Sequence, residues 1–207
     1  MERKILVATT NAGKVAELRA MLDVDVRWLT LSDFKDVARI KEDGLTFVEN
    51  ACKKAIGYAQ ATGLWTLSDD SGLVIDALDG GPGIQSARFC CEEVEDEDRS
   101  LIDRRNIEKV LKLLKGVPEQ ERTARFVCCL CLASPDEVLI ETEGTLEGLI
   151  TDQPVGVNGF GYDPVFLVPR LNRTVAQLTA EEKNAISHRG NAIRKLKPML
   201  KAILKTA

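Results

Sequence analysis

Continuous apolar runs along the chain alternate with segments in which apolar positions recur every three or four residues. Short apolar runs are typical of buried strands, and the three-to-four spacing is typical of amphipathic helices. The runs predict strands over residues 4–10, 24–31, 64–67, 73–78, 122–133, 137–142, 146–150 and 165–168. The spacing predicts helices over residues 14–22, 46–61 and 99–114, a short helix after Thr179 and a last helix after Ser187.

Local signals sharpen the ends of these helices. Thr46 with Glu49, and Thr179 with Glu182, match the capping box that opens a helix. Pro198 falls inside the last helix and is expected to kink or weaken it. Because no internal repeat, low-complexity tract or linker interrupts the pattern, we expect one α/β domain over residues 1–207, whose middle hairpins can form a second lobe.

Composition narrows the function classes. The chain has 207 residues, 44% hydrophobic and 29% charged, which is ordinary for a globular protein. Its net charge of −4 argues against nucleic-acid binding, which usually needs a basic excess. No apolar run reaches membrane-span length, and MERKILVATT lacks the apolar core of a signal peptide. We therefore expect a cytoplasmic protein with no nucleic-acid and no membrane partner.

The chain contains six cysteines. Three of them lie in the apolar run FVCCLCLA, where we interpret them as small buried hydrophobic residues rather than zinc ligands or disulfide partners. The acidic run over residues 92–98 is interpreted as a solvated helix entrance.

Two adjacent acids, Asp69 and Asp70, follow the strand predicted over residues 64–67, so we expect an acidic loop there. Paired carboxylates suit a hard divalent cation such as Mg²⁺, and the cation would remove the repulsion between them. Glu42 could complete this metal site. The alternative is a pair of turn or capping acids.

The segment from Thr9 to Lys14 joins a predicted strand to a helix start, where backbone N–H groups favour an anion. Thr9, Asn11 and Lys14 add side-chain groups, although the segment is not a Walker A loop. It therefore indicates either a phosphate site or an ordinary polar turn.

Two later segments carry further candidate chemistry. In NGFGYDP, glycines flank Phe160, whose ring could stack on a flat ligand; the alternative is a tight turn with one core aromatic. In KNAISHR, Lys183, His188 and Arg189 cluster near a helix start and indicate either an anion site or a surface basic patch.

The motifs ATTNAGK, GLTFVENA, SDDSGL, GGPGIQSARF, GFGYDPVF and EEKNAISHRG resemble, in order and spacing, those of the RdgB/inosine triphosphate pyrophosphatase family. The resemblance extends from about residue 4 to residue 192. It implies a two-lobed α/β fold, with a long mixed central sheet flanked by helices and an active site in the cleft between the lobes. It also implies a homodimer.

The reaction that the resemblance implies is the hydrolysis of dITP, ITP or XTP to the monophosphate and pyrophosphate with Mg²⁺, for which Mn²⁺ could substitute. Asp70 would be the catalytic residue, and Glu42 with Asp70 would hold the metal. The implied substrate-binding residues are Thr9, Thr10, Asn11, Ala12, Gly13, Lys14, Lys54, Ser71, Phe160, Gly161, Tyr162, Asp163, Lys183, His188 and Arg189.

Two alternatives stay open at this point. One is a Maf-type nucleotide pyrophosphatase with a different base preference. The other is a nucleotide-binding sensor that does not turn its ligand over.

Overall fold

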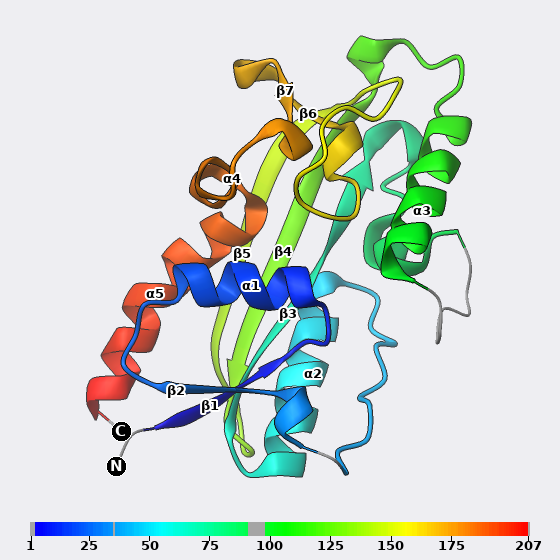
Figure 1. Cartoon of the computed structure of the whole chain (residues 1–207). Coiled ribbons are helices and arrows are strands. Elements are labelled where there is room, and N and C mark those ends of the chain that lie inside the picture. The colour runs from blue at the N-terminus through cyan, green and yellow to red at the C-terminus, as the bar shows by residue number, and fades with distance from the viewer. Residues whose placement is uncertain (1–2, 35, 91–97, 207) are drawn as a thin grey trace. The chain divides into compact units, whose positions relative to one another are not determined.

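The computed structural model describes residues 3–34, 36–90 and 98–206 (Figure 1). The helices are α1 (Ala12–Met21), α2 (Phe47–Thr62), α3 (Arg99–Leu113), α4 (Ala180–Ile186) and α5 (His188–Thr206). The strands are β1 (Lys4–Ala8), β2 (Arg27–Thr30), β3 (Trp65–Ile75), β4 (Thr123–Ala133), β5 (Val138–Ile150), β6 (Phe166–Val168) and β7 (Arg173–Thr174).

The strands form one seven-stranded sheet in the order β2-β1-β3-β4-β5-β6-β7. Strand β1 is parallel to both β2 and β3, whereas β6 is antiparallel to both β5 and β7. The sheet is therefore mixed, and helices flank it, which confirms the predicted α/β class and mixed central sheet.

The chain divides into two compact units. Unit 1 comprises Met1–Asp70, Cys128–Gly144 and His188–Ala207, and unit 2 comprises Ser71–Val127 and Thr145–Ser187. Each unit has its own hydrophobic core. The core of unit 1 includes Ile5, Leu67, Leu130 and Leu196. The core of unit 2 includes Leu73 and Ile150 and contains the stacked rings of Phe126 and Phe166, whose centroids are 4.3 Å apart.

Helix α2 shows how local sequence positions a functional side chain. The Thr46 hydroxyl accepts a hydrogen bond from the Glu49 N–H at 3.2 Å, and Gly63 ends the helix with a φ of 69°. Small buried residues such as Ala55 let the helix pack closely in unit 1. Lys54 lies among these buried positions, so α2 carries an ammonium group into the interior of unit 1.

The predicted acidic loop is wrong. Strand β3 runs unbroken from Trp65 to Ile75, and Asp69 and Asp70 are both part of it. Adjacent aspartates have low strand propensity, but here basic side chains compensate both charges, and tertiary contacts override the local preference. In the same way β5 joins two predicted strands into one, and α5 continues as helix through Pro198.

The remaining predictions about composition have mixed outcomes. Cys128, Cys129 and Cys131 are buried free thiols, as expected for small hydrophobic residues. Residues 92–97 of the acidic run lie outside the described residues, and Asp98 caps α3 by accepting from the Ser100 N–H at 2.9 Å. In the described part of the chain, no helix is both long and apolar enough to cross a membrane.

Candidate active site

Asp69 is a completely enclosed carboxylate in unit 1, with a side chain that is 0% exposed. Its Oδ2 accepts from Nε of Arg189 at 2.7 Å, and its Oδ1 pairs with Nζ of Lys14. Burial alone would raise the pKa of Asp69, but the charges of Arg189 and Lys14 outweigh it and hold this pKa well below its usual value. Asp69 is therefore an ionised anchor that joins β3 to α1 and α5.

Asp70 projects from the opposite side of β3 because side chains alternate along a strand. Nζ of Lys54 donates to Oδ1 of Asp70 at 3.0 Å and to Oε2 of Glu42 at 3.0 Å. It also donates to the backbone carbonyl of Asp69 at 2.8 Å. One buried ammonium thus holds together the two carboxylates that the sequence nominates as metal ligands.

The pKa values of Asp70 and Glu42 are shifted in opposite directions. Burial raises the pKa of Asp70 to about 6, despite the opposing charge of Lys54. Burial also acts on Glu42, but there the Lys54 charge prevails and the pKa is lowered. Two neighbouring acids whose pKa values are shifted in opposite directions are typical of groups that divide acid–base and charge-holding roles.

The donor set around Lys54 fits a magnesium ion. Mg²⁺ prefers oxygen ligands and is usually held by one or two carboxylates together with water and substrate phosphates. Glu42 and Asp70 supply two carboxylates that converge on a single cationic group. Among the described residues, no group of three or more His, Cys, Asp or Glu side chains is arranged to hold a metal. The protein can therefore contribute the carboxylate share of such a site, and the remaining positions suit water or phosphate.

The segment from Thr9 to Lys14 connects β1 to α1, as predicted. Asn11 caps α1, since its Oδ1 accepts from the Lys14 N–H at 3.1 Å, and its own N–H donates to the Thr9 hydroxyl at 3.2 Å. The Lys14 charge acts on Glu42 and Asp70 as well as on Asp69, so the turn and the carboxylates share one electrostatic environment.

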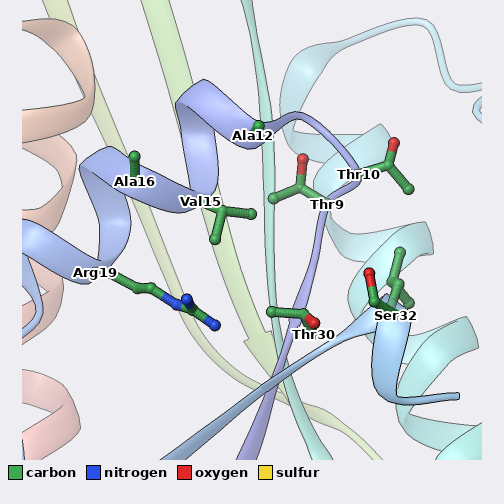
Figure 2. A pocket seen from close by; sticks show the side chains of 9 residues that line it. Thr9, Thr10, Ala12, Val15, Ala16, Arg19, Thr30 and Ser32 are labelled. Atoms are coloured by element: carbon green, nitrogen blue, oxygen red, sulfur yellow. The ribbon is translucent and has the colours of Figure 1, made fainter.

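A pocket of about 580 Å³ opens beside this turn (Figure 2). Side chains of α1 and of the segment around the end of β2 face each other across it. The lining residues are Thr9, Thr10, Ala12, Val15, Ala16, Arg19, Thr30, Leu31 and Ser32. The pocket thus includes part of the predicted phosphate segment together with residues that the sequence did not indicate.

Unit 2 holds a second group of predicted residues. Oδ2 of Asp163 accepts from the Phe160 N–H at 2.9 Å and from Nζ of Lys183 at 2.5 Å. The same ammonium lies 4.5 Å from the centroid of the Phe160 ring. Asp163 and Lys183 are both buried, so the ion pair is well shielded and fixes the ring and the ammonium relative to each other.

Gly159 lets the backbone before Phe160 approach the Asp163 carboxylate closely. Gly159 has a φ of +78°, and a Cβ built there would overlap with the Asp163 carboxylate. The contact between Tyr162 and substrate that the resemblance implies stays a prediction. Tyr162 is buried in the core of unit 2, and its hydroxyl donates to the Ser86 carbonyl at 2.8 Å.

The other nominated residues occupy distinct positions. His188 begins α5 and is 6% exposed, and Ser71 follows Asp70 in β3. Arg189 is buried with its guanidinium held between Asp69 and Glu17, so its predicted contact with a base stays a prediction. Glu17 and Cys128, whose thiol lies 3.2 Å from Oδ2 of Asp69, were not predicted. No local pattern marks them, because both act through contacts that are distant in sequence.

Comparisons with known proteins match nearly the whole chain. The model of the Ham1 family matches residues 5–199. A dITP/XTP pyrophosphatase of Geobacter sulfurreducens is 48% identical over 198 residues, which cover 95% of this chain and 96% of that protein. One of Halalkalibacterium halodurans is 49% identical over 92% of this chain and 95% of that protein. The solved structure of a HAM1 protein from Coxiella burnetii has a TM-score of 0.85 at 40% identity and covers 97% of this chain and 99% of that chain.

Proposed function

The chain belongs to the Ham1 family, and we propose that it hydrolyses deaminated purine nucleoside triphosphates, such as dITP, ITP and XTP, to the monophosphate and pyrophosphate. One observation carries this conclusion: relatives named dITP/XTP pyrophosphatase are 48–49% identical over more than nine-tenths of the chain. The site geometry then assigns chemical roles to individual residues.

The reaction needs a water molecule aligned with a phosphorus atom and compensation of the charge that develops on the phosphate oxygens. In this proposal Asp70 orients and deprotonates the water, since its pKa of about 6 suits a general base near neutral pH. Lys14 and Lys54 supply fixed positive charge for the phosphates, as electrostatic stabilisation requires. Asp69 acts indirectly by holding Lys14 in place.

Glu42 and Asp70 would hold Mg²⁺ in this proposal, for the reasons of donor type given above. When bound, Mg²⁺ would neutralise phosphate charge. The Thr9–Lys14 segment would bind the phosphates through the N–H groups at the start of α1.

The purine would bind to the Phe160, Asp163 and Lys183 group of unit 2. Its aromatic ring offers a stacking face, and its buried ammonium is a hydrogen-bond donor. A 6-keto purine presents an acceptor where adenine presents an amino group, and a buried donor left without an acceptor is costly. This contrast supports selection of inosine and xanthine over adenine.

Product analysis with ITP tests the proposal. With Mg²⁺ we expect inosine monophosphate and pyrophosphate in equal amounts, with no orthophosphate. Because the carboxylates offer only hard oxygen ligands, excess chelator should abolish turnover, Mn²⁺ should restore it and Zn²⁺ should not. Binding of ITP without release of pyrophosphate would instead indicate a sensor. Full turnover in excess chelator would contradict the metal role. A homodimer remains a proposal that rests on the family resemblance, and a cytoplasmic location remains a proposal from the sequence.

A further inference from the structure

One side chain of helix α3 contacts the backbone of the loop over residues 158–163, called the Phe160 loop from here on. Oδ2 of Asp103 accepts a hydrogen bond from the Gly161 N–H at 2.8 Å. The Asp103 side chain is 14% exposed, and its Oδ1 pairs with Nε of Arg99, one helical turn earlier, at 3.2 Å. A carboxylate acceptor makes this contact stronger than a hydrogen bond between neutral groups.

The position of this contact in the loop gives it a specific consequence. The Gly161 N–H belongs to the peptide group that follows Phe160, and the Phe160 N–H belongs to the group that precedes it. Asp103 holds the first of these N–H groups, and Asp163 holds the second at 2.9 Å. Carboxylates therefore hold the peptide groups on both sides of Phe160, and they restrain the backbone from which its ring extends beside Lys183.

Helix α3 and the loop are also linked indirectly, because side chains from both bond the Ser86 carbonyl. The Tyr162 hydroxyl donates to the Ser86 carbonyl at 2.8 Å. Asn106, on the turn of α3 after Asp103, lies 3.4 Å from the same carbonyl through Nδ2 and accepts from the Cys90 N–H at 2.7 Å. Helix α3 thus supports the loop indirectly through the Ser86 carbonyl and directly through Asp103, which bonds the peptide group beside Phe160.

We propose that Asp103 is a positioning residue for purine binding, which keeps the Phe160 ring oriented by holding the Gly161 peptide group. The inference rests on the proposed function, because it takes the Phe160 loop as the purine site. Asp103 itself touches neither the phosphates nor the reacting atoms in this account. Its loss should therefore weaken base binding and leave phosphate binding and the chemical step largely unchanged.

The experiment compares steady-state kinetics with ITP for wild type and four variants, each checked by thermal unfolding. Asp103→Ala removes the acceptor, and Asp103→Thr keeps a polar group that is too short to reach Gly161. Asp103→Asn retains an amide oxygen that can accept the same hydrogen bond. Glu108→Ala is the matched control, because it removes an acid from the exposed face of α3. Inhibition by inorganic tripolyphosphate reports phosphate binding separately.

We expect Asp103→Ala and Asp103→Thr to raise KM for ITP about tenfold with kcat within about threefold, as for loss of uniform binding. Asp103→Asn should stay within about threefold of the wild-type KM, and the inhibition constant of tripolyphosphate should not change in any variant. A parallel loss of kcat and tripolyphosphate affinity, or an unchanged KM in whichever of the two variants folds, would overturn the inference. If wild type fails to hydrolyse ITP, dITP and XTP, the proposed function itself fails, which is a separate outcome.

Discussion

At the scale of single residues, the neighbouring aspartates Asp69 and Asp70 on β3 have different charged partners and opposite pKa shifts. Asp69 is enclosed and compensated by Arg189 and Lys14, so its charge is part of the structure of unit 1. Asp70 is held by Lys54 together with Glu42, and burial raises its pKa to about 6. Asp69 therefore stays ionised, whereas Asp70 can gain or lose a proton near neutral pH.

Replacing each aspartate by asparagine should distinguish the structural role of Asp69 from the catalytic role of Asp70. Asp69→Asn removes one of the two carboxylates that pair with the buried Arg189, and we expect it to destabilise the fold by about 3 kcal/mol. Asp70→Asn should leave the fold intact but reduce turnover of ITP by about 10³-fold, since it removes the base. Urea unfolding and single-turnover kinetics measure the two effects. Equal losses of stability, or turnover by Asp70→Asn within tenfold of wild type, would contradict the division of roles.

The raised pKa of Asp70 also predicts a pH dependence of stability. A carboxyl whose pKa is higher in the folded than in the unfolded state binds protons preferentially when folded, so its contribution to stability is lost as pH rises through about 6. Asparagine has no such titration. In chelator, the melting temperature of Asp70→Asn relative to wild type should therefore increase from pH 5 to pH 7.5. A constant or decreasing difference would mean that Asp70 ionises at its ordinary value.

The resemblance to a known family nominates Asp70, Glu42, Lys14 and Lys54 as site residues. In the structure Lys54 pairs with both acids, and the Lys14 charge acts on them. The sequence did not reveal which cation each acid would meet. The pairing of Asp69 with Arg189 joins positions 120 residues apart, and no local pattern encodes such a contact.

At the scale of elements, helices were easier to predict than strands. Helix α2 was predicted over residues 46–61 and spans Phe47–Thr62, because the Thr46 cap and the Gly63 stop act through adjacent residues. Strand β3 was predicted as two strands around a loop, because its aspartates disfavour a strand until distant cations compensate them.

The geometry of the Phe160 loop depends on two glycines with positive φ, Gly159 and Gly161. Gly159→Ala would drive a methyl group into the Asp163 carboxylate, and we expect KM for ITP to rise at least tenfold because the loop must reopen. Gly161 has a φ of +60° but no neighbouring atom within 4 Å of an added Cβ. Gly161→Ala should therefore carry only the backbone cost of about 1 kcal/mol, with a smaller rise in KM. Steady-state kinetics of both variants provide the comparison, and a larger effect at position 161 would contradict it.

At the scale of the whole molecule, the α/β class followed from alternating strand and helix patterns. The strand order did not, since β3 lies between β1 and β4 through pairings that periodicity alone does not specify. The division into two units likewise depends on contacts between segments far apart in sequence. The resemblance of ordered motifs, rather than any single one, connected this fold to a reaction.

The central claim is that the chain selects deaminated purine triphosphates and releases pyrophosphate. The most direct test is kcat/KM for pyrophosphate release across ITP, dITP, XTP, ATP, GTP and CTP under identical Mg²⁺ concentrations. A site that rejects a mismatched base by leaving a buried donor unsatisfied should discriminate by at least about 10²-fold. We predict this advantage for ITP, dITP and XTP over ATP and CTP, whose bases carry an amino group in place of the 6-keto acceptor. Comparable values for ATP or CTP, or release of orthophosphate instead of pyrophosphate, would contradict the account.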